Sequence, residues 1–239
     1  MCRNFPENKQ IGAERSKKRA ELLHKCMSGH LPLRMRKLGM DELDRKSVNE
    51  FRESEKTPVI IVLDNIRSMH NVGSVFRTAD AFLLRGILLC GYTPQPPHRD
   101  IHKTALGATE TVEWKYFPTA AGAVLSLKEQ GFRIFAVEQV ENSIPLQKFA
   151  LEEFGSGPAL SAGVGMSASG ESGPGERGAQ HSGGLAVIFG NEVSGVGDEV
   201  LALCDGSVEI PQWGMKHSLN ISVAAGIVLW ELVRGQSKI

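Results

Sequence analysis

The stretch Ile210-Pro211-Gln212-Trp213-Gly214-Met215-Lys216-His217-Ser218-Leu219-Asn220-Ile221-Ser222-Val223 predicts the passage from a strand into a helix. The run 207–210 is typical of a short strand, and Pro211 and Gly214 predict a turn after it. Ser218 is a residue type that favours the capping position of a helix. The residues after it are apolar on nearly every side, so we expect the helix over 218–234 to be largely buried.

Apolar runs of the same kind recur upstream and alternate with helical patterns. The predicted strands are 59–63, 86–90, 133–137, 185–189 and 207–210, with a weaker candidate at 111–116. The predicted helices are 72–83, 120–130, 198–204 and 218–234. This alternation predicts an α/β fold, a mostly parallel sheet with helices on both faces. In such sheets, ligands bind at the loops beyond the carboxyl ends of the strands.

Composition divides the 239 residues into a basic N-terminal arm, residues 1–57, and a domain over 58–239. Residues 1–56 contain 14 Lys and Arg and 9 Asp and Glu, a net charge of +5, whereas the whole chain has none. Such an arm suits contact with a phosphate backbone, although on charge alone a solvated helical tail is the preferred interpretation. Within the domain, residues 155–184 contain ten Gly and six Ser, which predicts a flexible insertion.

The cysteines and the hydropathy pattern restrict the class of protein. Cys2, Cys26, Cys90 and Cys204 include no C-x-x-C pair, which excludes a zinc ribbon and argues against a disulfide framework. The chain has no run of the roughly 20 apolar residues that a membrane span requires, and its first residues contain no apolar signal core. We therefore expect a cytoplasmic protein.

Two further segments follow predicted strands and contain polar residues. In the segment 64–80, apolar residues at helical spacing predict one buried face, while Ser74, Arg77 and Asp80 line the other, with Asn71 near the start. Arg77 would face the crevice at the strand ends and could hold a phosphate, or it could simply pair with Asp80. In the segment 189–197 three glycines permit a tight turn, but the Gly-Lys-Ser/Thr of a P-loop is missing.

Taken together, the three segments resemble the motifs of the SpoU (TrmH) family of RNA ribose 2′-O-methyltransferases, within the SPOUT superfamily. The first resembles the family's Asn…Arg motif at Asn71 and Arg77, and the second its Gly-x-Glu-x-x-Gly motif at Gly190, Glu192 and Gly195. The third resembles the Ile-Pro…Gly…Ser-Leu-Asn-x-Ser-Val motif almost throughout. The resemblance extends over residues 58–234 apart from the insertion.

The resemblance implies a sheet whose C-terminal part forms a deep trefoil knot, and S-adenosylmethionine as the methyl donor. It also implies a homodimer with composite active sites and a tRNA or rRNA substrate. The implied cofactor-binding residues are Gly190, Ile210 and Leu219, largely through their main chain, and Glu138 in the loop after the strand 133–137. The implied catalytic residues are Arg77, with Asn71, Glu192, Ser218 and Asn220 around it.

The role of Arg77 in this chemistry has two interpretations. The family's arginine has been regarded as the general base, but a guanidinium stays protonated in proteins under ordinary conditions. In the alternative that we favour, Arg77 fixes the adjacent phosphate and stabilises negative charge developing on the ribose 2′-oxygen.

Parts of the sequence bear on three other functions: metal binding, nucleotide-dependent oxidoreduction and RNA binding without catalysis. His98 and His102 have metal-ligand spacing, but Pro94-Gln95-Pro96-Pro97 before them predicts a loop and no third ligand is evident, so we expect an RNA-facing loop and no metal. A nucleotide-binding oxidoreductase needs a Gly-rich turn after the first strand, and 64–69 contains no glycine. A catalytically inactive RNA-binding protein of the same fold is the alternative that a methyl-transfer assay would decide.

The basic arm leads to a first prediction. If residues 1–56 supply RNA affinity through phosphate contacts, their deletion weakens RNA binding and flattens its salt dependence. The measurement is RNA affinity as a function of salt concentration for the full and the shortened chain. An unchanged slope would rule this role out.

Overall fold

The computed structural model describes residues 36–39, 42–43, 46–149, 183–215 and 218–234. The chain divides into two compact units, Met1–Arg45 and Lys46–Ile239. In the first unit, Arg36 and Glu42 form an ion pair with a distance of 2.7 Å from Nη2 to Oε1. The elements below all belong to the second unit. Most of the predicted insertion lies outside the described residues.

The elements of the second unit follow one another in the expected alternation. In chain order they are α2 (Val48–Glu53), β1 (Thr57–Asp64), α3 (Met69–Ala81), β2 (Leu84–Cys90), α4 (Arg99–Ala105), α5 (Ala108–Thr111), β3 (Trp114–Phe117), α6 (Ala120–Glu129), β4 (Arg133–Val137), β5 (Ile144–Pro145), the 3-10 helix η2 (Leu146–Lys148), β6 (Leu185–Phe189), α7 (Asp198–Leu201), β7 (Gly206–Glu209) and α8 (Ile221–Val233).

The strands form one sheet in the order β3-β2-β1-β6-β4-β7-β5, and every pairing is parallel. β6 comes late in the chain but pairs with β1 on one side and with β4 on the other. All five of its residues are buried, as expected for a strand covered on both faces. This confirms the predicted α/β fold and its parallel sheet.

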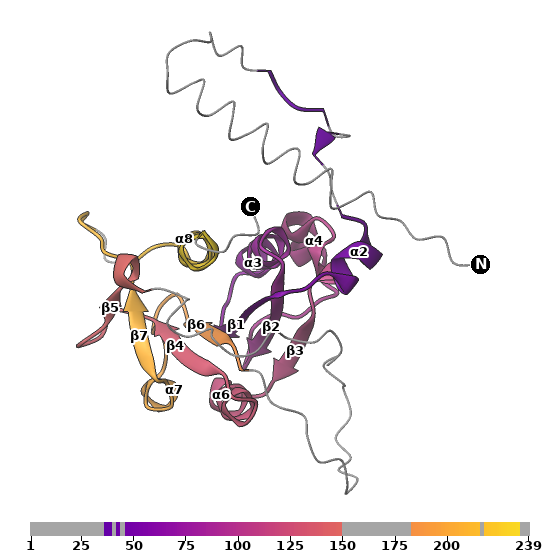
Figure 1. Ribbon diagram of the computed structural model, residues 1–239. Helices are drawn as coiled ribbons and strands as arrows, with labels where there is room; N and C mark the ends of the chain where they lie inside the picture. Colours follow the sequence, from indigo (N-terminus) through magenta and orange to yellow (C-terminus); the bar gives the residue numbers. More distant parts are fainter. Residues whose placement is uncertain (1–35, 40–41, 44–45, 150–182, 216–217, 235–239) are drawn as a thin grey trace, which may run out of the picture. The chain divides into compact units, whose positions relative to one another are not determined.

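Helices cover both faces of the sheet, as predicted (Figure 1). α3, α4 and α8 lie on one face, and α6 and α7 lie on the other. Successive residues of β1 alternate between the two cores, because side chains along a strand point to opposite faces. Val59, Ile61 and Leu63 belong to the core under α3 and α8, whereas Ile60 and Val62 pack with α6.

α3 begins earlier than its apolar pattern predicted, because Ser68 caps it with its side chain at 3.3 Å from the Asn71 backbone nitrogen. Within it, Gly73 permits close packing against α4. A Cβ at this position would lie 2.1 Å from Thr104 Oγ1 and 2.3 Å from the carbonyl oxygen of Ile101. The glycine in the motif of α3 is thus required for packing.

α3 and α8 run side by side in the same direction. Near their first residues, Asn220 Nδ2 donates to Asn71 Oδ1 at 3.2 Å. Near their last residues, the rings of Phe82 and Trp230 are 6.2 Å apart. The polar starts of both helices therefore lie together, at the same edge of the sheet.

Four local predictions were wrong. The candidate strand 111–116 is the end of α5 followed by β3, which starts at Trp114. The predicted loop at His98–Lys103 contains α4, because the His98 side chain accepts a hydrogen bond from the backbone of Asp100 and caps the helix. Asn220, and not Ser218, caps α8. The last two residues of the predicted insertion, Gly183 and Gly184, pack tightly, since a Cβ on Gly184 would lie 2.4 Å from the Pro58 carbonyl oxygen.

The expectation that α8 is largely buried was also wrong for the single chain. One face packs into the core through Ile221, Ala225, Val228, Leu229, Leu232 and Val233. The opposite face carries Val223, Ile227 and Trp230 at i, i+4 and i+7, and their exposed fractions are 50%, 39% and 52%. We call these three residues the α8 stripe. Its apolar character requires an explanation outside the core of one protomer.

Candidate active site

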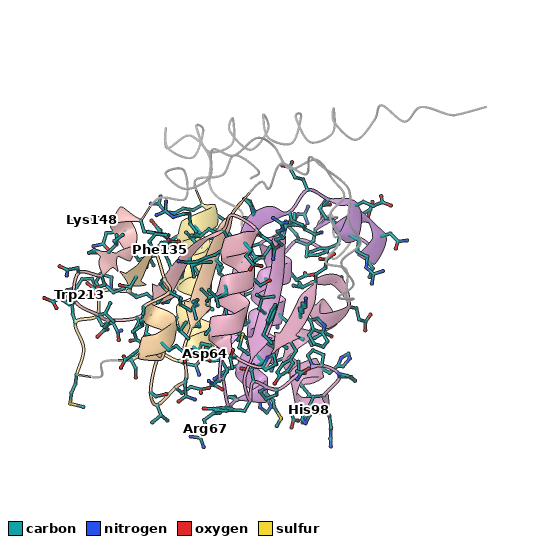
Figure 2. All side chains as sticks on the ribbon, turned by 90° about the horizontal axis from the view of Figure 1, so that it is seen from below. Asp64, Arg67, His98, Phe135, Lys148 and Trp213 are labelled. Atoms are coloured by element: carbon teal, nitrogen blue, oxygen red, sulfur yellow. The ribbon has the colours of Figure 1, made fainter. Side chains whose placement is uncertain are left out.

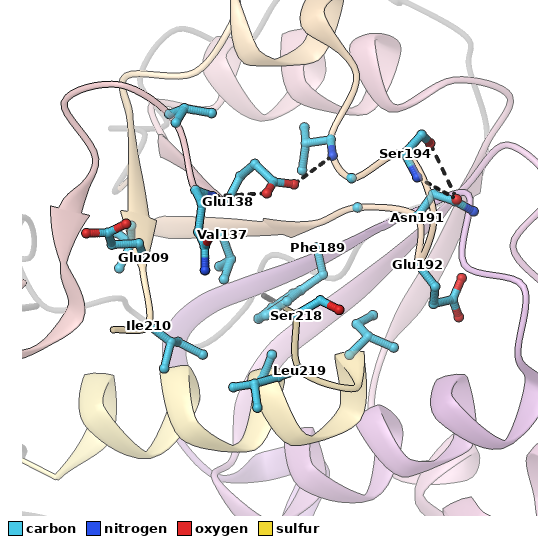
Figure 3. A pocket seen from close by; sticks show the side chains of 18 of the residues that line it. Val137, Glu138, Phe189, Asn191, Glu192, Ser194, Glu209, Ile210, Ser218 and Leu219 are labelled. Atoms are coloured by element: carbon cyan, nitrogen blue, oxygen red, sulfur yellow. Dashed lines mark hydrogen bonds between the residues drawn. The ribbon is translucent and has the colours of Figure 1, made fainter. Parts of the chain in front are cut away.

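A pocket of about 730 Å³ lies beyond the carboxyl ends of β4, β6 and β7. The ends of these strands and the loops after them supply residues 137–140, 189–196, 208–210 and 212, and the start of α8 closes the remaining side. Figure 3 shows Ile210 and Leu219 on one wall, with Glu138 and Phe189 across from them. The volume is in the usual range for small-molecule sites, and the position is the one that parallel sheets use for ligands.

Two glycines of the second motif permit the turn that forms one wall. Asn191 and Gly195 exchange backbone hydrogen bonds of 3.0 and 2.9 Å across this turn. A Cβ on Gly190 would lie 2.2 Å from the Gly195 carbonyl carbon. Gly195 has φ of +67°, and a Cβ there would lie 2.2 Å from Glu138 Oε2. Both positions therefore exclude any side chain.

Glu138 is fixed against that turn by main-chain donors. Its Oε2 accepts from the Val196 nitrogen at 3.2 Å and its Oε1 from the Gln139 nitrogen at 3.0 Å (Figure 3). Glu209, the last residue of β7, brings a second carboxylate to the pocket. The pocket thus combines apolar walls with negative charge, which suits a ligand that has both an apolar ring and a cationic group.

A chain of side-chain amides joins the three motifs at the mouth of this pocket. Asn220 Nδ2 donates to Asn71 Oδ1 at 3.2 Å, and Asn71 Nδ2 donates to Glu192 Oε1 at 3.3 Å. Glu192 Oε2 also accepts from the Arg67 backbone nitrogen at 3.2 Å. Residues that lie 121 and 149 positions apart in the sequence therefore form one hydrogen-bonded unit.

The orientation of each amide in this chain follows from a backbone donor. The Ser222 nitrogen donates to Asn220 Oδ1 at 2.9 Å, so the oxygen of that amide points into α8 and its nitrogen points outward. Asn71 must then offer its oxygen to Asn220, which leaves its nitrogen for the Glu192 carboxylate. Because an ionised carboxylate only accepts, Glu192 is a suitable end for the chain.

Asn191 connects the turn after β6 to the loop after β1, and the sequence did not predict this role. Only 8% of Asn191 is exposed. Its Nδ2 donates to the Asn65 carbonyl oxygen at 2.7 Å, and its Oδ1 accepts from the nitrogens of Val193 and Ser194 at 2.9 and 3.2 Å. An asparagine within a glycine-rich turn was the only signal in the sequence. The loop after β1, which contains Asn65 at φ +55°, gave none.

The sequence-predicted residues occupy two separate places in one protomer. Glu138, Gly190, Glu192, Ile210, Ser218, Leu219 and Asn220 line the pocket, and Asn71 is bonded to two of them. Arg77 does not line the pocket: it is exposed on α3 and makes no hydrogen bond or ion pair with any residue that the structure describes. It does not pair with Asp80, which instead accepts from Thr111 Oγ1 at 2.6 Å.

Two buried ionisable groups lie near the ends of β1 and β2. Burial raises the pKa of the Cys90 thiol to about 12, and the nearby Asp64 carboxylate adds to this, so Cys90 is a neutral core residue. Burial also raises the pKa of Asp64, which the Asn65 amide partly offsets. The part of the chain that the structure describes contains no group of three or more His, Cys, Asp or Glu that could hold a metal.

Fold and pocket together define a parallel α/β protein with a pocket of small-molecule size at its strand ends. The sequence model of the SpoU rRNA Methylase family matches residues 58–230. The chain belongs to this family. The predicted family is therefore confirmed.

Individual relatives agree with this assignment. The chain is 28% identical over 198 residues to a tRNA (guanosine(18)-2′-O)-methyltransferase of Thermus thermophilus, which covers 82% of this chain and 85% of the relative. It is 27% identical over 193 residues to a 23S rRNA (guanosine-2′-O-)-methyltransferase of Vibrio parahaemolyticus, over 81% of this chain and 66% of the relative.

Solved structures share the fold. The tRNA-modifying TrmH/SpoU enzyme of Aquifex aeolicus matches with a TM-score of 0.59 at 22% identity, over 78% of this chain and 79% of that one. An rRNA methyltransferase of Sinorhizobium meliloti, solved with S-adenosylmethionine bound, matches with a TM-score of 0.58 at 22% identity, over 82% of this chain and 62% of that one.

The pocket fits S-adenosylmethionine on its own chemistry. Phe189, Ile210 and Leu219 offer apolar walls to an adenine ring, and Glu138 and Glu209 offer carboxylates to a ligand with cationic groups. The bare backbone at Gly190 leaves room for close approach.

The glycine turn leads to a prediction with a matched control. Gly195→Ala should lower the affinity for S-adenosylmethionine at least about tenfold, because positive φ and the displaced Glu138 together cost of the order of 1–3 kcal/mol. Gly197→Ala should leave it unchanged, since nothing lies within 4 Å of a Cβ there and its φ is −65°. Titration calorimetry measures both. Equal affinities for the two variants would show that the turn does not shape the cofactor pocket.

Proposed function

We propose that this chain is an S-adenosylmethionine-dependent methyltransferase that methylates a ribose 2′-hydroxyl in tRNA or rRNA. The observation that carries the proposal is the amide chain from Asn220 through Asn71 to Glu192, because it unites the three family motifs at the mouth of a cofactor-sized pocket. A tritiated-methyl transfer assay on bulk RNA tests it, and absence of transfer would favour the inactive RNA-binding alternative.

The cofactor-binding role falls to Gly190, Ile210, Leu219 and Glu138, all of which line the pocket. When bound, S-adenosylmethionine supplies a sulfonium methyl group that is already a good electrophile. The protein then needs to align the ribose oxygen and assist the loss of its proton. Ser218 and Asn220 both line the pocket, and Asn220 also begins the amide chain, so we assign the two residues to the positioning of the ribose.

Glu192 and Asn71 give this positioning its rigidity. Each polar atom of the Asn71 amide has a partner, and both Glu192 oxygens accept hydrogen bonds. A preorganised set of dipoles does not need to reorient as charge develops on the 2′-oxygen. We therefore assign Asn71 and Glu192 to the catalytic site as positioning residues, which act by fixing the Asn220 side chain.

Arg77 fits this scheme if it acts in the pocket of a partner subunit. It is exposed and lies outside its own pocket, on the solvent side of α3 with His70 and Ala81. α3 is also a neighbour of α8, which carries the α8 stripe, since the two helices run side by side. A homodimer joined over α3 and α8 would cover the stripe and bring each Arg77 towards the partner. There its planar fork would hold a phosphate and stabilise the developing negative charge.

Further family properties are proposals for this chain on the same basis. We assign the domain to residues 58–239, with the 1–57 arm adding RNA affinity. We also propose a C-terminal trefoil knot, because the family to which the chain belongs implies it; an experimental structure with unthreaded C-terminal connections would refute it. We propose a cytoplasmic location, which cell fractionation tests. No helix of the described residues is long and apolar enough to cross a membrane.

Replacement of Arg77 is the sharpest test of the catalytic assignment. Arg77→Ala should lower methyl transfer about a hundredfold or more while leaving cofactor affinity intact, because the charge acts on the reacting oxygen and not on the cofactor. Methyl-transfer rates and titration calorimetry measure the two quantities. Arg133→Ala is the control, since it lies at the amino end of β4, away from the pocket, and removes a surface ion pair with Asp205 and a contact with the Phe135 ring. Lost cofactor affinity in Arg77→Ala would overturn the assignment.

The dimer has a test of its own. Ile227→Glu places a charge in the α8 stripe, so it should shift the protein to a monomer and lower methyl transfer about tenfold or more through mass action. Sedimentation and the transfer assay measure both effects. Leu125→Glu, on α6 at the other face of the sheet and 50% exposed, should remain a dimer with normal activity. A fully active Ile227→Glu monomer would refute the composite site.

A further inference from the structure

Tyr92 occupies an unusual position beside the pocket mouth. It follows β2 immediately after Gly91, which has φ of +63°. A Cβ on Gly91 would lie 2.0 Å from Asn65 Oδ1, so this turn requires glycine. The backbone nitrogen of Tyr92 donates to that same Asn65 oxygen at 3.2 Å. The backbone is therefore fixed at the loop that follows β1, although 62% of the residue is exposed.

The far end of the side chain is fixed as well. Asn191 Nδ2 donates to the Tyr92 hydroxyl oxygen at 2.7 Å. Since Asn191 Oδ1 accepts from the backbone nitrogens of Val193 and Ser194, the amide nitrogen must point towards Tyr92. Asn191 itself is buried and lines the pocket. The ring is thus held at both ends, by its backbone and by its hydroxyl, while most of it remains in solvent.

Exposed arginines lie on the loops at the same edge of the sheet. Figure 2 shows Arg67 and His98 along one edge, beyond Asp64. Arg67 is exposed, and its side chain makes no hydrogen bond or ion pair within the described residues. Arg99, the first residue of α4, is exposed beside His98. Two acidic residues of these loops already have partners. Glu192 accepts from the Asn71 side chain and from the backbone nitrogen of Arg67, and Asp100 pairs with Lys103 at 2.7 Å.

An exposed aromatic ring at an edge of the sheet that also carries exposed arginines has the chemistry of a site for single-stranded nucleic acid. Bases stack on aromatic rings, and arginines contact the adjacent phosphates. A ring already held in place loses little conformational entropy when a base stacks on it. A protein partner would be less suited to this edge, because charged residues such as Arg67 and Arg99 are depleted at the centres of protein–protein interfaces.

We propose that Tyr92 is the stacking platform for a base of the substrate RNA, next to the nucleotide whose ribose enters the pocket. This proposal rests on the proposed RNA methyltransferase function. It assigns to Asn191 the role of a positioning residue, which fixes the ring through the hydroxyl. It also assigns Arg67 and Arg99 to the flanking phosphates.

The test compares three variants in methyl transfer to total RNA from cells that lack the gene. Tyr92→Leu removes the π face and should raise the apparent KM for RNA by about tenfold or more, with kcat and S-adenosylmethionine affinity unchanged. Tyr92→Phe keeps the ring and loses one hydrogen bond, so its KM should rise by no more than about threefold. Tyr116→Leu is the matched control, because the chain's other tyrosine lies on the edge strand β3, far along the sheet from the pocket.

The outcomes separate this proposal from the function on which it rests. If the unchanged protein transfers no methyl group to RNA, the proposed function fails. If it does, and Tyr92→Leu keeps a normal KM, the stacking proposal alone fails. Equal losses in the Phe and Leu variants, or lost cofactor affinity in both, would show that Tyr92 only supports the Asn191 turn, which also overturns the proposal. Normal RNA methylation with a lost protein interaction would point to a protein partner instead.

Discussion

The insertion of β6 between β1 and β4 is the constraint on which the rest of the structure depends. β6 is formed by residues 185–189, yet it pairs in parallel with strands that begin at residues 57 and 133. A shift by one residue would exchange Leu185, Val187 and Phe189 of one core with Ala186 and Ile188 of the other, so the packing of both cores stabilises this register. The end of β6 consequently brings the Gly190–Gly195 turn between the loop of β1 and the loop of β4. The pocket and the amide chain both begin there.

Hydrogen bonds between side chains at the strand ends then hold together the loops that the sheet brings close. Asn191 ties its turn to the loop after β1, and Glu192 ties it to the start of α3. Asn220 adds the start of α8. Asn191 and Asn220 also accept hydrogen bonds from main-chain donors of their own segments. Asn191 thereby closes its turn and Asn220 caps α8, while each side chain at the same time contacts another segment. Local folding and the assembly of the site are therefore coupled through the same atoms.

Much of the fold was predictable from the sequence, because buried parallel strands such as 185–189 have uninterrupted apolar runs. The pocket residues were predictable only through the family motifs, since nothing local in Glu138 or Leu219 indicates a ligand. The misplaced elements have physical reasons. α4 begins at a histidine cap after a proline-rich segment, and α8 is capped by Asn220 because Ser218 is still in the preceding loop. The roles of Asn65, Tyr92 and Asn191 were not predictable from the sequence, because they consist of contacts between residues far apart in it.

The α8 stripe has a consequence for how the protein behaves in the cell. In the proposed homodimer the active sites form only when two chains meet, so activity would depend on the equilibrium between free and paired chains. Below the dissociation constant of the pair, the number of working sites would fall with the square of the protein concentration. The rate of RNA methylation would then rise more than proportionally with the rate of protein synthesis. A newly made chain would also expose Trp230 and its neighbours until it found a second copy.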